Sequence, residues 1–172
     1  MTGLIVLPVA LFVLSQSGEI KSSEQLIRAR RTIHSFLLLG FDVYFLPVRQ
    51  TLAKLKEFQF DLSILREDSW QDRPIYVVGA KKGDSHSPQF WIDKERLYFV
   101  RLLQPAGEDG SQTQEVQFNE YMRLAGCWIS PEVVIKLDGE VVMTEEYSRI
   151  KAGGKLDPKL FDPERWGTVR WR

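Results

Sequence analysis

The sequence predicts an α+β fold in which a curved antiparallel sheet carries helices packed on its concave face. Three observations lead to this prediction. The first half of the 172-residue chain contains two segments with helical periodicity. The second half contains six apolar-rich runs with a period of two, which is the period of a half-buried strand. Each of those runs ends in turn-forming residues, so we expect the strands to follow one another as hairpins.

The segment formed by residues 1–17 has two interpretations. Residues 4–14 are apolar apart from Pro8, and the run is too short to span a membrane as a helix. Its length suits the apolar region of a secretory signal, with small residues following at positions 15–18. No Lys or Arg precedes the run, however, although such signals normally start with positive charge. The second interpretation is a buried first strand that continues into a turn, and the sequence supports both about equally.

Residues 22–65 are expected to be mainly helical. A first helix is predicted over residues 24–39, and Gly40 follows it as a stop signal. A second helix is predicted to start near Pro47, because proline suits the first turn of a helix. The apolar stripes are Leu26, Ile33, Phe36 and Leu37 on the first helix, and Val48, Leu52 and Leu55 on the second.

Residues 75–151 are expected to form a β-meander. The preceding residues 66–72 form a polar stretch to which no strand is assigned. The strongest hairpin signal is Asp138-Gly139, since Asp-Gly supplies the positive φ angles that a type I′ turn requires. The predicted strands span residues 75–80, 89–93, 97–103, 114–121, 128–137 and 140–151.

Residues 156–172 are predicted to be a tail that closes a single domain formed by residues 1–172. Asp157 can cap one helical turn that begins at Pro158. Leu160 and Phe161 are then expected to pin the tail onto the sheet.

Composition and motifs exclude several classes of function. The 23 Lys and Arg residues balance the 23 Asp and Glu residues, so no global field attracts nucleic acid. The single cysteine, Cys127, cannot form an internal disulfide, and neither His34 nor His86 has a partner at metal-site spacing. The strained-elbow motif of serine hydrolases is absent from the sequence. We therefore predict no catalytic residue, no metal ligand, no cofactor and no transmembrane span.

Seven phrases in the last hundred residues resemble, in order and spacing, the outer-membrane lipoprotein-sorting family of LolA-like periplasmic carriers. The resemblance implies an incomplete antiparallel β-barrel wrapped around helices, with an apolar cavity for acyl chains. It also implies a non-enzymatic protein of the periplasm or cell envelope. The phrases span residues 70–78, 90–93, 97–101, 116–121, 128–132, 146–150 and 156–161.

Two classes of function follow from this reading. The first is a carrier that holds acyl chains of a lipid or lipoprotein in a cavity between sheet and helices. The second is a non-catalytic structural or protein-interaction domain of the envelope, whose core is filled by its own side chains. A third class, a hydrolase acting on an apolar ester, has no motif in its favour. If the cavity exists, alternation along the strands predicts these wall residues: Leu52, Leu55, Phe90, Ile92, Phe99, Phe118 and Ile135.

Overall fold

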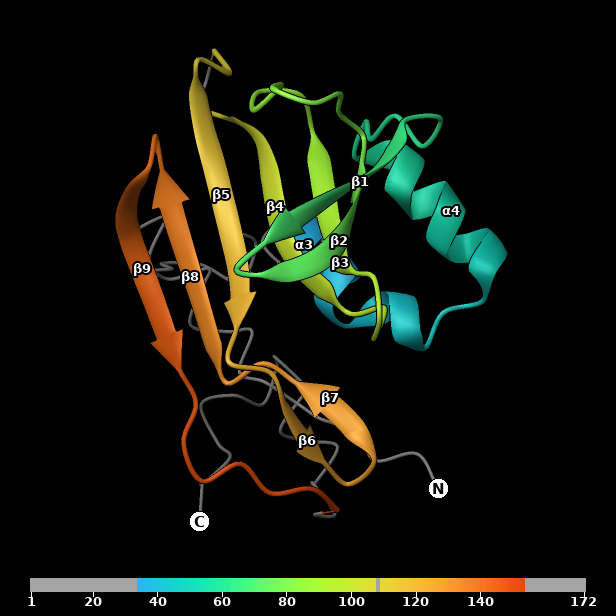
Figure 1. Cartoon of the computed structure of the whole chain (residues 1–172), viewed down its shortest axis with the longest axis vertical. Helices are drawn as coiled ribbons and strands as arrows, with labels where there is room; N and C mark the ends of the chain where they lie inside the picture. Colours follow the sequence, from blue (N-terminus) through green and yellow to red (C-terminus); the bar gives the residue numbers. More distant parts are fainter. Residues whose placement is uncertain (1–33, 108, 154–172) are drawn as a thin grey trace, which may run out of the picture. The chain divides into compact units, whose positions relative to one another are not determined.

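The structure is a computed structural model that describes residues 34–107 and 109–153, and within it His34–Arg149 forms one compact unit. Seven strands form one antiparallel sheet in the order β1-β2-β3-β4-β5-β8-β9 (Figure 1). The remaining two described strands, β6 and β7, pair with each other as a separate ribbon. Within residues 34–107 and 109–153, two short α-helices accompany the sheet, and the sheet is not closed into a barrel. The predicted α+β class and antiparallel sheet are confirmed.

The helices precede the sheet in the described chain. Helix α3 spans Ser35–Gly40, the 3₁₀ helix η1 spans Asp42–Tyr44, and helix α4 spans Val48–Glu57. Pro47 is the N-cap of α4, so the predicted start of the second helix is confirmed. Helix α3 includes Gly40, one residue beyond the predicted end at residue 39. It begins only at Ser35, and His34 before it is extended, so the prediction of a helix through residue 34 is wrong. Residues 24–33 of the first predicted helix lie outside the described residues.

The strands follow one another along the chain, so the predicted meander is confirmed in outline. Each strand of the main sheet pairs with its neighbour in the chain, except that the β6–β7 ribbon is inserted between β5 and β8. The Asp138-Gly139 turn has φ angles of 49° and 86°, as a type I′ hairpin turn requires. The strands are β1 Leu65–Trp70, β2 Arg73–Val78, β3 Gln89–Asp93, β4 Phe99–Ala106, β5 Gln112–Asn119, β6 Met122–Leu124, β7 Cys127–Ile129, β8 Glu132–Leu137 and β9 Glu140–Glu146.

Three strand predictions are wrong in detail. The polar stretch at residues 66–72 contains the edge strand β1, whose side chains alternate between exposed and partly buried positions. A mostly polar edge strand gives no apolar run to detect. The single strand predicted at residues 128–137 is two strands, because Pro131 between them has no N–H to donate to a ladder. The last strand ends at Glu146 and does not reach residue 151.

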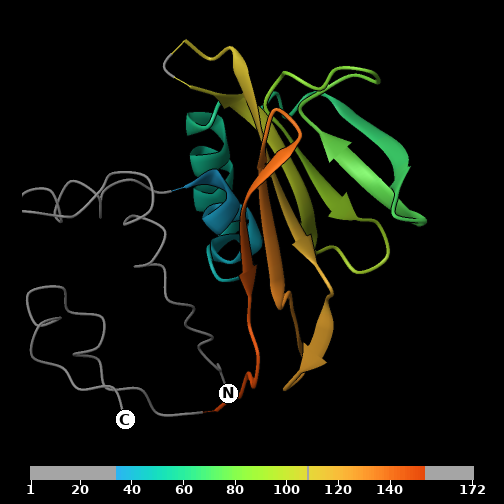
Figure 2. The ribbon, with the colours of Figure 1, turned by 90° about the vertical axis from the view of Figure 1, so that its left-hand side faces the viewer.

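Both faces of the sheet carry an apolar layer. Figure 2 shows α3 and α4 on one side, which we call the helix face, and the β1–β2 hairpin bent toward the other side, the hairpin face. The hairpin therefore bends away from α3 and α4, and the concave side of this bend does not face the two helices. The hairpin-face core consists of Ile75, Val77, Trp91, Tyr98, Val100 and Leu103, with Trp70, Tyr121 and Trp128 packed against it.

The interpretations of residues 1–17 and the helical turn predicted at Asp157 to Phe161 both lie outside the described residues. They stay predictions.

Candidate functional site

The five strand residues predicted to line a pocket lie together on one face of the sheet. Residues directly opposite each other in an antiparallel pair share a face. A bulge between Trp91 and Ile92 brings Phe99, and not Val100, opposite Ile92. The register then aligns Phe90 with Leu102, Leu102 with Val116, Val116 with Ile135, and Phe118 with Val133. Contacts of Phe118 with the end of α3 identify this face as the helix face.

The helix-face layer is packed by the protein's own side chains around Phe118. The Phe118 ring centre lies 5.0 Å from that of Phe99 and 5.8 Å from that of Phe41. A Cβ atom placed on Gly40 would come within 2.5 Å of the Phe118 ring, so the end of α3 lies directly against this ring. The same layer continues to Phe90, whose ring centre lies 5.0 Å from that of Phe60 in a T-shaped arrangement.

Helix α4 is attached to the unit much less firmly than α3. Its one buried residue is Leu55, although the helix is ten residues long. Leu52, which was predicted to line the same wall, is 45% exposed. Of the seven predicted pocket residues, five are buried and Ile92 is half-buried, so Leu52 is the one that the fold leaves open.

A polar group lies buried on the inner side of α4. Thr51 precedes Leu55 by one helical turn, and its side-chain oxygen is buried with no hydrogen-bond partner within the described residues. An unsatisfied buried hydroxyl costs about 1–3 kcal/mol. Sequence patterning did not single out Thr51, because a threonine on a helix gives no signal of burial.

Exposed apolar side chains continue outward from Leu55 along α4 and the segment before it. Phe45 is 62% exposed and Val48 is 75% exposed, and Tyr44 is half exposed although its hydroxyl accepts a hydrogen bond from the Phe99 N–H. The sequence assigned Val48 and Leu52 to a buried stripe. The stripe is real, but only its Leu55 end is buried. We call Tyr44, Phe45, Val48 and Leu52 the α4 stripe.

The hairpin face contains a half-buried ion pair. Arg101 Nε donates to Glu115 Oε1 at 2.6 Å, and its guanidinium lies 4.2 Å from the centre of the Trp91 ring. Burial opposes ionisation of Glu115, but hydrogen bonds from Arg101 and Gln117 outweigh it and hold the pKa of Glu115 below its ordinary value. These groups satisfy one another, so the pair stabilises the sheet and leaves neither charge available for a substrate.

The turn between β3 and β4 and the β6–β7 ribbon bring basic and aromatic side chains together next to the hairpin-face core. The guanidiniums of Arg96 and Arg123 lie 5.1 and 4.9 Å from the centre of the Trp128 ring. Their neighbours in the chain, Leu97 and Met122, are large exposed apolar residues. Arg, Trp and Met are enriched in protein–protein interfaces. We call these five residues the Trp128 patch.

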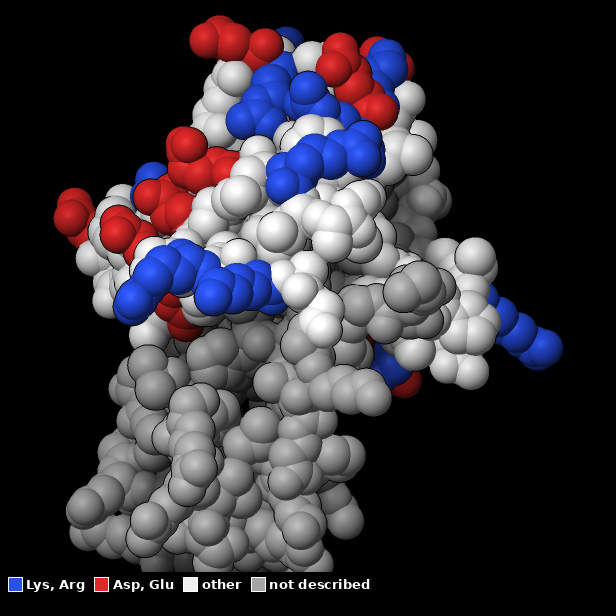
Figure 3. All heavy atoms as spheres, turned by 90° about the horizontal axis from the view of Figure 1, so that it is seen from below, with Lys and Arg blue, Asp and Glu red and all other residues white. Residues whose placement is uncertain are grey.

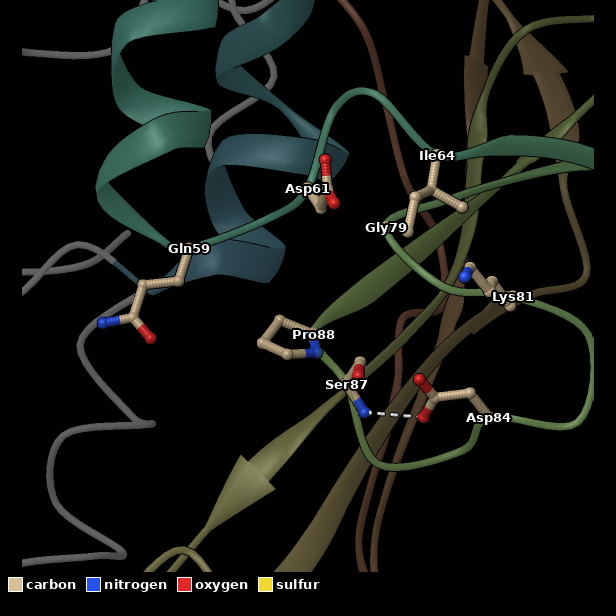
Figure 4. Close-up of a pocket in the computed structure, with 8 residues that line it drawn as sticks. All are labelled: Gln59, Asp61, Ile64, Gly79, Lys81, Asp84, Ser87 and Pro88. Carbon is tan, nitrogen blue, oxygen red and sulfur yellow. Dashed lines mark hydrogen bonds between the residues drawn. The ribbon is translucent and has the colours of Figure 1, made fainter.

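Figure 4 shows a pocket between the segment that follows α4 and the β2–β3 loop. Asp84 accepts hydrogen bonds from the backbone N–H groups of Ser87 and His86, and Asp61 accepts from Ser63. These bonds hold the pKa of both carboxyls below their ordinary values. Both acids are thus engaged in their own turns, and the polar walls do not suit an acyl chain. The lining residues are Gln59, Asp61, Ile64, Gly79, Lys81, Asp84, Ser87 and Pro88.

The charged surface is mixed. Figure 3 shows Lys and Arg side chains beside Asp and Glu side chains on the end of the unit seen from below. Within residues 34–107 and 109–153, no three His, Cys, Asp or Glu side chains are placed to hold a metal ion. In the same residues no helix has the length and apolar character needed to cross a membrane.

Comparison of the chain with models of protein families, with curated proteins and with solved structures finds no match. Among the candidate sites, the junction between α4 and the helix face has the geometry and chemistry best suited to a ligand. It combines an apolar layer, a weakly attached helix and an unsatisfied hydroxyl in one place.

Proposed function

We propose that the chain is a carrier of the bacterial cell envelope that holds the acyl chains of a lipid or lipoprotein between α4 and the helix face of its sheet. The observation that supports this most is the attachment of α4. Ten helical residues are held with only Leu55 buried, while the hydroxyl of Thr51 is buried without a partner. The periplasmic location and the likeness to an incomplete barrel are part of the same proposal, and they rest on the resemblance to lipoprotein-sorting carriers.

The energetics of opening this junction favour an apolar ligand. Displacing α4 exposes the buried Leu55 side chain, at a cost of about 1.5–3 kcal/mol. Each acyl CH₂ group that enters the apolar layer contributes about 0.8 kcal/mol. Roughly four CH₂ groups therefore offset the cost of moving the helix, and a longer chain supplies net affinity. Displacing α3 would expose four buried residues and has no comparable compensation.

Thr51 gives the site a preference for a chain with a polar head. Its hydroxyl can donate to the carbonyl oxygen of an ester or amide, which is the group that joins an acyl chain to a lipid or lipoprotein. A hydrogen bond from the Thr51 hydroxyl to the ligand removes the free-energy cost of leaving this buried hydroxyl without a partner. The carrier binds and releases its ligand without making or breaking a bond, so the protein is proposed not to be an enzyme.

Calorimetric titration with fatty-acyl probes of several chain lengths tests the proposal. We expect binding with a negative heat-capacity change, which is the mark of apolar burial, and an affinity that rises with chain length. Leu52→Asp is expected to weaken binding with little change in thermal stability, since Leu52 is already 45% exposed.

Val142→Asp is the matched control. Val142 on β9 is an apolar residue with 61% exposure. Strand β9 is an edge strand of the sheet and lies on the opposite side of Figure 1 from α4. Its substitution is expected to leave acyl binding unchanged. A well-folded sample that binds no acyl probe at any chain length would contradict the carrier.

The second candidate function is a protein-interaction domain of the envelope. Two observations favour it: the layer around Phe118 is filled by the protein's own rings, and the Trp128 patch has the composition of an interface. The titration separates the two candidates, because an interaction domain needs no ligand beneath α4.

A further inference from the structure

The α4 stripe contains the exposed large apolar side chains of residues 34–64. Val48 and Leu52 are four residues apart on α4 and thus share a face, and Phe45 lies in the turn between η1 and α4. Their exposed fractions are 75%, 45% and 62%. Side chains of this kind on one side of a helix need an apolar environment that the described fold does not give them.

Positive charge flanks the same face. Arg49 lies three residues before Leu52 and Lys56 lies four residues after it, so both border the exposed apolar side chains. Helix α4 has three basic residues, Arg49, Lys54 and Lys56, against the single acidic residue Glu57. None of these three basic residues forms an ion pair within the described part of the chain.

Two other exposed apolar surfaces lack this combination. Val141 and Val142 on β9 are comparably exposed, but Glu140, Glu145 and Glu146 share their strand. In the Trp128 patch the acidic residues Glu95 and Glu120 accompany the two arginines at the hairpin ends. An apolar stripe with a net positive border therefore occurs on α4, although the whole chain has a net charge of zero.

We infer that the α4 stripe docks on the surface of an anionic lipid bilayer. Helix α4 lies along the interface, with Phe45, Val48 and Leu52 among the first acyl groups and with Arg49 and Lys56 at the phosphates. A helix with an apolar face bordered by Lys and Arg is the pattern of interfacial membrane binding. This goes beyond the proposed carrier function and does not depend on it, because docking uses the exposed part of the stripe that ends at the buried Leu55 and needs no ligand beneath the helix.

Vesicle flotation of the full-length chain tests the docking. We compare vesicles of phosphatidylcholine with vesicles that also contain phosphatidylglycerol, at low and high salt. Docking predicts preferential partition onto the anionic vesicles, reduced by salt. Phe45→Ser with Val48→Ser should lower that partition by about tenfold or more, because two apolar side chains no longer leave water. Arg49→Gln with Lys56→Gln should lower it by about 30-fold, from roughly 1 kcal/mol for each charge.

Two control variants match these changes. Val141→Ser with Val142→Ser removes equally exposed apolar side chains from β9, and Lys81→Gln with Lys82→Gln removes two exposed charges from the β2–β3 loop. Both are expected to bind as the unaltered chain does. Because all these positions are largely exposed, the variants should fold, and the charge variant tests docking without altering any apolar residue.

An environment-sensitive label gives a second measurement at the site itself. Cys127 is the single cysteine, so Cys127→Ser with Val48→Cys places one label on the α4 stripe, and Val142→Cys in the same background places it on β9. Docking predicts a blue shift on anionic vesicles for the first label and not for the second. Equal partition onto both vesicle types, unchanged binding of the stripe variants, or a dimer that Phe45→Ser with Val48→Ser dissociates would overturn the inference.

Discussion

The two helices of the described unit differ in how they use their residues. Helix α3 has six residues and buries four of them, while α4 has ten residues and buries one. The end of α3 is fixed against Phe118, whereas α4 exposes the apolar residues Val48 and Leu52. Periodicity alone predicts both helices but not this difference. Helix α4 keeps apolar side chains exposed and can therefore contact a ligand. Helix α3 buries its apolar side chains and is part of the core.

The largest expected effect separates the helices directly. Leu38 on α3 is fully buried, so Leu38→Ala should lower the free energy of unfolding by about 2–5 kcal/mol. Leu52→Ala on α4 should change it by less than about 0.5 kcal/mol, as for an ordinary surface substitution. Urea denaturation measures both. Similar losses for the two variants would show that α4 is as firmly attached as α3.

An effect of intermediate size is expected for the hairpin face, where the Arg101–Glu115 ion pair makes the stability of the fold depend on pH. The pKa of Glu115 on the hairpin face is lower in the folded state than in the unfolded chain, so the unfolded state binds more protons in acid. The stabilisation by ionised Glu115 is therefore complete above its unfolded pKa and is lost as the pH falls through the folded pKa. Glu115→Gln should flatten this loss of stability between about pH 5 and pH 3, since the variant has no carboxyl to protonate.

The control for the pH experiment is Glu140→Gln, which removes an exposed carboxyl from β9. Its stability should follow the acid dependence of the unaltered protein. If the stability of Glu115→Gln has the same acid dependence as that of the unaltered protein, the Arg101–Glu115 pair contributes no pH-dependent stability.

The smallest expected effect has the opposite sign. Thr51→Val removes the buried, unpartnered hydroxyl of α4 and nearly preserves its shape. The free protein should gain about 1 kcal/mol, while affinity for an acyl ester should fall. Thermal unfolding and calorimetric titration of the same variant give both values. A loss of stability would show that the hydroxyl has a partner in solution, and the polar part of the proposed site would then be wrong.

The sequence predicts most of the sheet, because its strands are bounded by turn chemistry. Strand β3 is predicted to the residue, and the Asp138-Gly139 turn has the predicted φ angles. Strand β1 is not predictable from apolar alternation: as an edge strand with mostly polar residues it depends on pairing with β2. Pro131 indicates the break between β7 and β8. The apolar residues on either side of it nevertheless led to the prediction of one continuous strand.

The candidate site is predicted less completely than the sheet. Alternation selected Phe90, Phe99, Phe118 and Ile135, which the register brings to the helix face. The face that a strand buries is decided by period two, so the sequence contains that information. How much of a helix stripe is covered depends on the placement of the helix on the sheet. For this reason the exposure of Val48 and the burial of Thr51 were not predictable from residue types.

Hydrogen–deuterium exchange with and without a fatty-acyl ligand tests the central claim most directly, since it reports on α3 and α4 in the same sample. Without ligand, the amides of α4 should exchange faster than those of α3, because α4 is held by fewer buried side chains. With saturating ligand, exchange should slow in α4 and in the strands beneath it and stay unchanged in β9. Slowing confined to β6 and β7, or no slowing anywhere on saturation, would contradict an acyl site beneath α4.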